Sequence, residues 1–153
     1  GWGSASGSTG MVGGQLNDIE AQRKKEISLE LLKRIHSHKT GVLIRASVRV
    51  GGILGGAGPK KLSQLTSFGE KAGLAFQIAD DVLDVEGEEK KLGKPVGRDH
   101  SQGRCTYPAL MGLSCAKKEA QVLIEEALAE LAAFGPEADP IRRIASFIID
   151  REK

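Results

Sequence analysis

An acidic cluster interrupts the longest apolar helical pattern in this chain. Large apolar side chains recur along one face from Lys60 to about Val85, which predicts a single long helix. The residues of this stripe are Leu62, Leu65, Phe68, Ala72, Phe76, Ala79 and Leu83. Near the end of the same segment stand Asp80, Asp81 and Asp84, and a helix places Asp80 and Asp84 one above the other. Carboxylates so close to an apolar stripe are costly unless a cation lies opposite them, and we expect one there.

Composition limits the classes of protein to which the chain can belong. Its 153 residues are 40% hydrophobic and 27% charged, which predicts one soluble domain covering residues 1–153. A net charge of +2 and 4% aromatic residues argue against nucleic acid as a partner, and no apolar run approaches the length of a membrane span. Cys105 and Cys115 have no metal-binding or redox spacing, so we expect reduced thiols in a cytoplasmic protein.

Helical patterns dominate the rest of the chain. They cover residues 18–35, 106–112, 116–134 and 139–148, and the last of these begins with Asp139-Pro140. The segment 41–53 is ambiguous, because its apolar residues alternate as in a strand while a helical stripe fits nearly as well; the alternation slightly favours the strand. Since a lone strand is unstable, we predict an all-α fold.

Three stretches rich in glycine or polar residues separate these patterns. Residues 1–14 contain six glycines and suit either a flexible linker or a helix that another backbone approaches closely. We expect the glycine-rich segment from Gly51 to Pro59 to break the chain. Residues 87–103 are polar and include four glycines, which predicts a mobile loop.

The acids and several basic residues together indicate a chemistry. Magnesium prefers carboxylate oxygens, and one or two carboxylates suffice when substrate phosphates and waters complete its coordination. The three aspartates therefore predict a magnesium site, although acids that simply face water are the commoner case for such a motif. Lys39 precedes an expected helix start, and Lys94 lies in a polar stretch with Arg104. Basic residues beside carboxylate-bound magnesium suit a diphosphate.

Five sequence blocks occur in an order that is similar to one known family. They are Gly13-Gly14-Gln15-Leu16-Asn17-Asp18-Ile19, His38-Lys39-Thr40-Gly41, Gly73-Leu74-Ala75-Phe76-Gln77-x-x-Asp80-Asp81-x-x-Asp84, Leu92-Gly93-Lys94 and Gly103-Arg104-Cys105-Thr106-Tyr107-Pro108. Together they resemble the C-terminal half of the short-chain trans-polyprenyl diphosphate synthases, and most of all the bacterial farnesyl diphosphate synthases. The resemblance covers nearly the whole chain, and its most specific part is the F-Q-x-x-D-D-x-x-D run after a K-T-G.

The resemblance implies a fold and a reaction. The fold is an all-α bundle of the isoprenoid-synthase type around a deep cavity, usually in a homodimer, with residues 41–53 and the glycine-rich start both helical. The reaction is the condensation of an allylic diphosphate with isopentenyl diphosphate to give geranyl or farnesyl diphosphate. In that reaction Mg²⁺ draws off the allylic diphosphate, and the double bond of isopentenyl diphosphate attacks the carbocation left behind.

The same resemblance implies roles for the acids. Asp80 would be a magnesium ligand of the second aspartate-rich motif of the family. Asp81 and Asp84 would bind the metal through water or orient it. Gln15 and Asp18 would support the cavity wall.

It also implies a substrate site. Lys39 and Lys94 would hold the allylic diphosphate, and Arg104, which stands where many relatives carry lysine, would contribute a further cation. Thr40 and Gln77 would steady the developing carbocation with their oxygen dipoles.

One departure from the family pattern bears on activity. The 153 residues contain a single D-D-x-x-D, whereas the family uses a first aspartate-rich motif upstream for other magnesium ions. We therefore expect the chain alone to be an incomplete and inactive part of a longer synthase. Two alternatives stay open: a non-catalytic subunit that binds diphosphate or a partner chain, and a plain helical domain whose acids face water.

Overall fold

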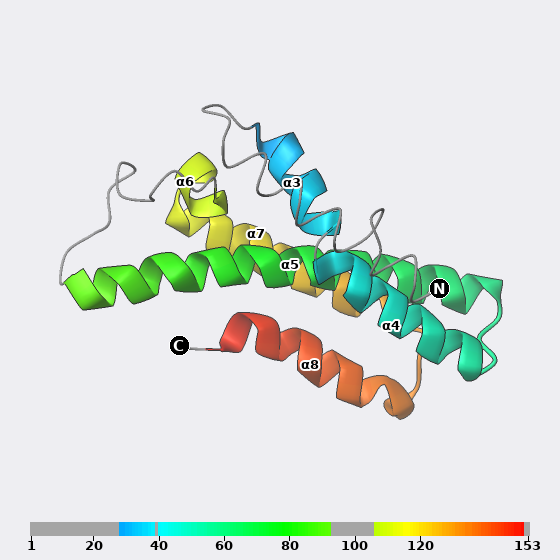
Figure 1. The fold of residues 1–153 in the computed structure, drawn as a ribbon. Coiled ribbons are helices and arrows are strands. Elements are labelled where there is room, and N and C mark those ends of the chain that lie inside the picture. Colours follow the sequence, from blue (N-terminus) through cyan, green and yellow to red (C-terminus); the bar gives the residue numbers. More distant parts are fainter. Residues whose placement is uncertain (1–27, 39, 93–105, 152–153) are drawn as a thin grey trace.

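The computed structural model describes residues 28–38, 40–92 and 106–151 of the 153. These residues form helices joined by short turns, with no strand among them (Figure 1). In chain order the elements are α3 (Leu29–His38), α4 (Thr40–Leu54), α5 (Pro59–Leu92), α6 (Tyr107–Met111), α7 (Leu113–Glu130), the 3-10 turn η1 (Pro136–Ala138) and α8 (Asp139–Asp150). The all-α prediction is confirmed. The expectations for residues 1–27, including the glycine-rich start, lie outside the described residues.

The long helix α5 is the centre of the arrangement. Helices α4 and α7 pack along different sides of it, and α8 also contacts it (Figure 1). Its predicted apolar stripe supplies much of the core, and the stripe residues that are at most 7% exposed are Leu65, Phe68, Ala72 and Ala79. Because neighbours cover more than one face, α5 also buries residues outside the stripe, chiefly Ala75, Ile78 and Val82.

Two buried clusters tie α5 to its neighbours. The first joins it to the second half of the chain, whose buried members there are Ile124, Ala127, Leu131, Ala145 and Ile148. The second lies toward the acidic end of α5 and consists of Leu32, Ile78, Val82, Tyr107, Ala116 and Ala120. Fully burying a large apolar side chain contributes about 1.5–3 kcal/mol, so this second cluster anchors the end of α5 that carries the aspartates.

Residues 41–53 are helical, and the strand that their alternation slightly favoured is wrong. They belong to α4, which lies directly on the backbone of α5 at two glycines. A Cβ atom added to Gly73 would lie 2.5 Å from the Cα of Gly41, and one added to Gly69 would lie 2.7 Å from the Cα of Arg45. As a helix α4 satisfies its own backbone hydrogen bonds and can pack this closely, whereas a lone strand would have no partner in the described residues.

Two predicted boundaries on either side of α5 are also corrected. Helix α4 continues through Gly51 and Gly52 to Leu54, so the break is confined to a turn in which Gly56 adopts a φ of 69°. At its other end α5 continues to Leu92, so residues 87–92 are helical rather than part of a loop. Glutamate, lysine and leucine are good helix formers and outweigh the roughly 1 kcal/mol cost of one glycine within this run. Residues 93–105 lie outside the described residues.

The C-terminal helices begin close to where the sequence predicts. Thr106 caps α6, its hydroxyl oxygen accepting from the Ala109 amide at 3.3 Å. Helix α7 starts at Leu113, three residues before the predicted position, and α8 starts at Asp139 with proline in its first turn. None of the described helices combines the length and the apolar character that a membrane crossing requires.

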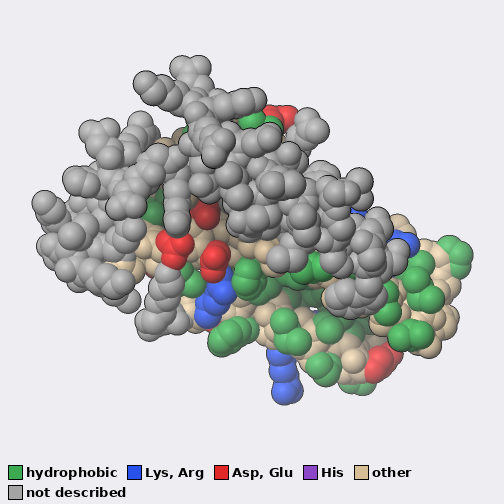
Figure 2. All heavy atoms as spheres, viewed as in Figure 1, with side chains coloured by type: hydrophobic (Ala, Val, Ile, Leu, Met, Phe, Trp, Pro, Cys, Tyr) green, Lys and Arg blue, Asp and Glu red, His purple; other side chains and the backbone are tan. Residues whose placement is uncertain are grey.

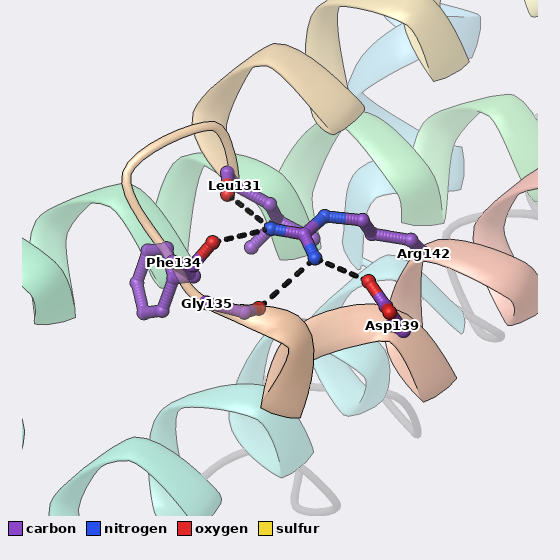
Figure 3. A network of polar contacts seen from close by, with 5 residues as sticks. All are labelled: Leu131, Phe134, Gly135, Asp139 and Arg142. Atoms are coloured by element: carbon purple, nitrogen blue, oxygen red, sulfur yellow. Dashed lines mark hydrogen bonds and ion pairs between the residues drawn. The ribbon is translucent and has the colours of Figure 1, made fainter.

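Arg142 of α8 closes the connection between α7 and α8. Its guanidinium donates to the carbonyl oxygens of Leu131, Phe134 and Gly135 at 2.7, 2.7 and 3.0 Å, and to a carboxylate oxygen of Asp139 at 2.6 Å (Figure 3). The carbonyls of Leu131 and Gly135 also accept the backbone N–H groups of Phe134 and Ala138, and the guanidinium adds a charged hydrogen bond to all three carbonyls of this connection. This contact sets the direction in which α8 returns along α5.

Candidate functional site

The three aspartates of the motif have different surroundings on α5. The Asp80 side chain is 54% exposed, Asp81 is half-buried and Asp84 is exposed. A carboxylate oxygen of Asp81 accepts the backbone N–H of Tyr107, the first residue of α6, at 3.0 Å. Asp81 is therefore held in place by another helix, while the side chains of Asp80 and Asp84 are exposed to solvent.

Tyr107 connects this contact to the hydrophobic core. Its side chain is fully buried in the second cluster, beside Ile78 and Val82 of α5. Burial raises the pKa of the phenol, and the negative charges of Asp81 and Glu119 raise it further. The phenol is therefore neutral throughout the physiological range, and the packing of its ring fixes the amide that Asp81 accepts.

Thr40 and Gln77, which the resemblance implies as neighbours of the reacting centre, lie side by side. The Gln77 side-chain amide donates to the hydroxyl oxygen of Thr40 at 3.1 Å, and Gln77 is only 8% exposed. Gln77 precedes Asp81 by one helical turn, so the pair adjoins the acids along α5. Thr40 is the first residue of α4, as expected for a helix start, and puts the positive end of that helix beside the pair.

Glycine packing positions this pair. Gly73 stands one turn before Gln77 on α5, and Gly41 follows Thr40 on α4. The two backbones touch at these glycines, since a Cβ on Gly73 would be 2.5 Å from the Cα of Gly41. Any side chain at that point would push Thr40 away from Gln77, so the missing side chains are what allow the hydrogen bond.

The expected cation opposite the acids is Arg151, which sequence reasoning missed. Its Nη2 lies 3.2 Å from Oδ1 of Asp80, although the two residues are 71 positions apart. No spacing rule connects such positions; the signal in the sequence was the arginine that follows the amphipathic pattern of α8. In Figure 2 acidic and basic side chains meet beside the C-terminal end of α8, while exposed apolar side chains and a few charged ones lie along the rest of that helix.

Several predicted site residues are not placed by the structure. Lys39, Lys94 and Arg104 lie outside the described residues, as do Gln15 and Asp18. Among the residues that are described, no three acidic, histidine or cysteine side chains converge closely enough to enclose a metal ion. This arrangement fits Mg²⁺ bound through one or two carboxylates with substrate oxygens completing its coordination, because Asp80 and Asp84 offer hard oxygen atoms at an open surface.

Comparison with known proteins identifies the family. The sequence profile of the family described as Polyprenyl synthetase matches residues 5–135. The chain belongs to this family. It is 46% identical to the farnesyl diphosphate synthase of Escherichia coli (strain K12) over 98% of this chain and 51% of that protein. Across curated relatives such as this one, the chain spans about half of the relative's length.

Solved structures of polyprenyl synthetases share the fold. An FPP/GFPP synthase from Zymomonas mobilis superposes with a TM-score of 0.82 at 36% identity, covering 96% of this chain and 48% of that one. A geranyltransferase from Helicobacter pylori, crystallised in complex with magnesium and isoprenyl diphosphate, superposes with a TM-score of 0.72 at 32% identity, covering 96% of this chain and 48% of that one. The fold is therefore the all-α isoprenoid-synthase fold that the resemblance implied.

Proposed function

We propose that this chain supplies the second magnesium–diphosphate wall of a prenyltransferase that condenses an allylic diphosphate with isopentenyl diphosphate. The observation that carries the proposal is the row formed by the Gln77–Thr40 pair and the three aspartates along one stretch of α5. Membership of the polyprenyl synthetase family, and relatives named as farnesyl and geranylgeranyl diphosphate synthases, support the same reaction. Synthesis of geranyl or farnesyl diphosphate is the proposed product range.

In this proposal each described residue has a distinct task. Asp80 and Asp84 would hold Mg²⁺, and Asp81, fixed by the Tyr107 amide, would orient it. The bound metal supplies positive charge that stabilises the departing diphosphate. The Gln77 side chain donates an N–H to the Thr40 hydroxyl, and this hydrogen bond fixes the orientation of the amide. The side-chain oxygens of Gln77 and Thr40 then carry the dipoles that would favour positive charge on the allylic carbon.

The basic residues complete the proposed substrate site. Lys39 directly precedes α4, whose N-terminal backbone amides favour an anion. With Lys94 and Arg104, it would bind the allylic diphosphate beside the acids that would hold Mg²⁺. The row of carboxylates alone would repel a diphosphate, so both cation sources are needed.

The experiment uses the sequence identity with the Escherichia coli enzyme, which extends over 98% of this chain. A chimera joins the part of that enzyme that precedes the matched half to residues 1–153 of this chain. Incubated with geranyl diphosphate, isopentenyl diphosphate and Mg²⁺, the chimera should form a longer prenyl diphosphate. Asp80→Asn should abolish this activity, whereas Glu125→Gln, which removes an exposed acid from α7, should not.

The chain by itself should give no product above the blank, because it carries a single D-D-x-x-D. Turnover by the chain alone would contradict the division of labour proposed here. A chimera whose activity is unaffected by Asp80→Asn would contradict the assigned site.

A further inference from the structure

The side chain of Arg151 reaches from the end of α8 to the acidic segment of α5. Its Nη2 donates to Asp80 Oδ1 at 3.2 Å and lies 3.5 Å from the backbone oxygen of Phe76. The guanidinium also stacks on the Phe76 ring, 4.4 Å from its centroid. The Arg151 side chain is 19% exposed, whereas that of Asp80 is 54% exposed. The arginine side chain is thus mostly buried against α5, whereas the carboxylate that it contacts is still exposed to solvent.

This contact occupies the carboxylate that the proposed function assigns to magnesium. A guanidinium and a divalent cation on the same carboxylate repel each other strongly, because little water separates them. Asp80 therefore cannot accept both cations at full strength. Arg151 contacts only Oδ1, so the second oxygen stays available to a metal, and each cation weakens the binding of the other.

The structure makes Arg151 the group that moves. Its Nε is buried without a hydrogen-bond partner among the described residues, so the inserted position leaves one donor unsatisfied. Arg151 also lines a cavity of about 450 Å³ between α5, α7 and α8, together with Glu86 and Asp150. Glu86 is already paired with Lys117, which lines the same cavity, so the exposed Asp150 is the acid that offers a displaced guanidinium a second position, while Asp80 is fixed to the helix α5.

We propose that Arg151 is the internal counter-ion of Asp80 in the metal-free chain and that magnesium displaces it. The inference rests on the proposed function, since it takes Asp80 as a magnesium ligand. It adds a residue that tunes metal affinity: Arg151 keeps Asp80 from acting as an unpaired acid before substrate arrives, and it weakens magnesium binding.

The test is calorimetric titration of Mg²⁺ into the full chain at a fixed concentration of inorganic diphosphate. Partly exposed ion pairs are weak, so Arg151→Gln should raise the magnesium affinity about two- to fivefold. Arg143→Gln is the matched control, because it removes the same charge from an exposed site on the same helix. It should change the affinity less than twofold. Arg151→Lys, which keeps the charge but loses the planar fork, should fall between wild type and Arg151→Gln.

A double-mutant cycle separates direct competition from a general field effect. In an Asp80→Asn background, Arg151→Gln should no longer change the magnesium affinity. A fall in affinity on Arg151→Gln, or no change, would overturn the displacement. If Asp80→Asn itself leaves the wild-type affinity unaltered, the magnesium assignment of the proposed function fails instead.

A spectroscopic readout follows the arginine itself. The ring current of Phe76 should shift the Nε–H resonance of Arg151 in the free chain, and Phe76→Leu identifies that resonance by removing the shift. Addition of Mg²⁺ and diphosphate should move the resonance toward the position seen in Phe76→Leu. A resonance that keeps its position under saturating metal would show that the guanidinium stays on Phe76 and would refute the proposal.

Discussion

Replacing Gly73 with alanine tests the close approach of α4 and α5 that brings Thr40 to Gln77. The new methyl carbon would lie 2.5 Å from the Cα of Gly41. Carbon atoms in ordinary contact are about 3.5–4.0 Å apart, so the helices must separate by about 1 Å or more. Both atoms are fixed to helical backbone, so no side-chain rotation relieves the clash.

Three effects decide the size of the change in stability. Overpacking of a close contact costs about 1–3 kcal/mol. The Gln77–Thr40 hydrogen bond, 3.1 Å long, should be lost as the helices separate, which costs about 1 kcal/mol more. Alanine is a better helix former than glycine and returns about 1 kcal/mol. We therefore expect Gly73→Ala to lower the free energy of unfolding by about 1–3 kcal/mol.

Gly51→Ala is the matched control for this prediction. Gly51 lies within α4, and a Cβ added there meets nothing within 4 Å. Only the helix-propensity gain applies, so this variant should be more stable than wild type by about 0.5–1 kcal/mol. Urea unfolding followed by far-ultraviolet circular dichroism compares both variants with wild type. Equal stability of Gly73→Ala and Gly51→Ala would refute the close approach of the two helices.

Substitutions at three further residues test other contacts. Arg142→Ala should lower the free energy of unfolding by about 2 kcal/mol because it removes charged hydrogen bonds to three carbonyl oxygens, and Arg142→Lys should recover less than half, both measured by urea unfolding. Hydrogen bonds from Lys71 and then Ser67 lower the pKa of Glu130 in the folded chain. The ionised carboxylate therefore stabilises the fold above its unfolded pKa of about 4.5, and this contribution is lost as the pH falls through the lower folded pKa. In acid titrations of stability, the difference between wild type and Glu130→Gln should vanish below the folded pKa. Asp81→Asn should keep the Tyr107 hydrogen bond and thus the thermal midpoint within a few degrees, yet lower magnesium–diphosphate affinity about tenfold by calorimetry, whereas an unchanged affinity would exclude a role for the Asp81 charge.

Local patterns predicted most of the helices but not their contacts. The α5 stripe, the short helix within 106–112 and the Asp139-Pro140 start follow from side-chain periodicity and from the residues that begin helices, which act over a few residues. The segment 41–53 could not be decided in this way, since its alternation and its helical stripe differ little. Packing against Gly69 and Gly73 of α5 decides it, and that is a tertiary effect.

In the candidate site, too, local sequence predicts the residues but not the contacts between them. The acids were visible as a motif, and the Thr40–Gln77 pair came from the resemblance, because nothing in the spacing of residues 40 and 77 brings them together. The Asp81–Tyr107 contact joins α5 to α6, two helices whose relative position no local pattern predicts. The Arg151–Asp80 pair depends on the return of α8 along α5, which the Arg142 network directs. Contacts of this kind follow from the assembled core and not from local sequence.

Paramagnetic mapping is the most direct test that the acids of α5 and the Gln77–Thr40 pair form one metal–diphosphate site. Mn²⁺ replaces Mg²⁺ in oxygen sites and broadens nearby amide resonances. With Mn²⁺ and inorganic diphosphate added to the ¹⁵N-labelled chain, the amides of residues 77–84, Thr40 and Tyr107 should broaden first. Broadening centred instead on the acids of α7, or spread evenly over the surface, would contradict the site proposed here.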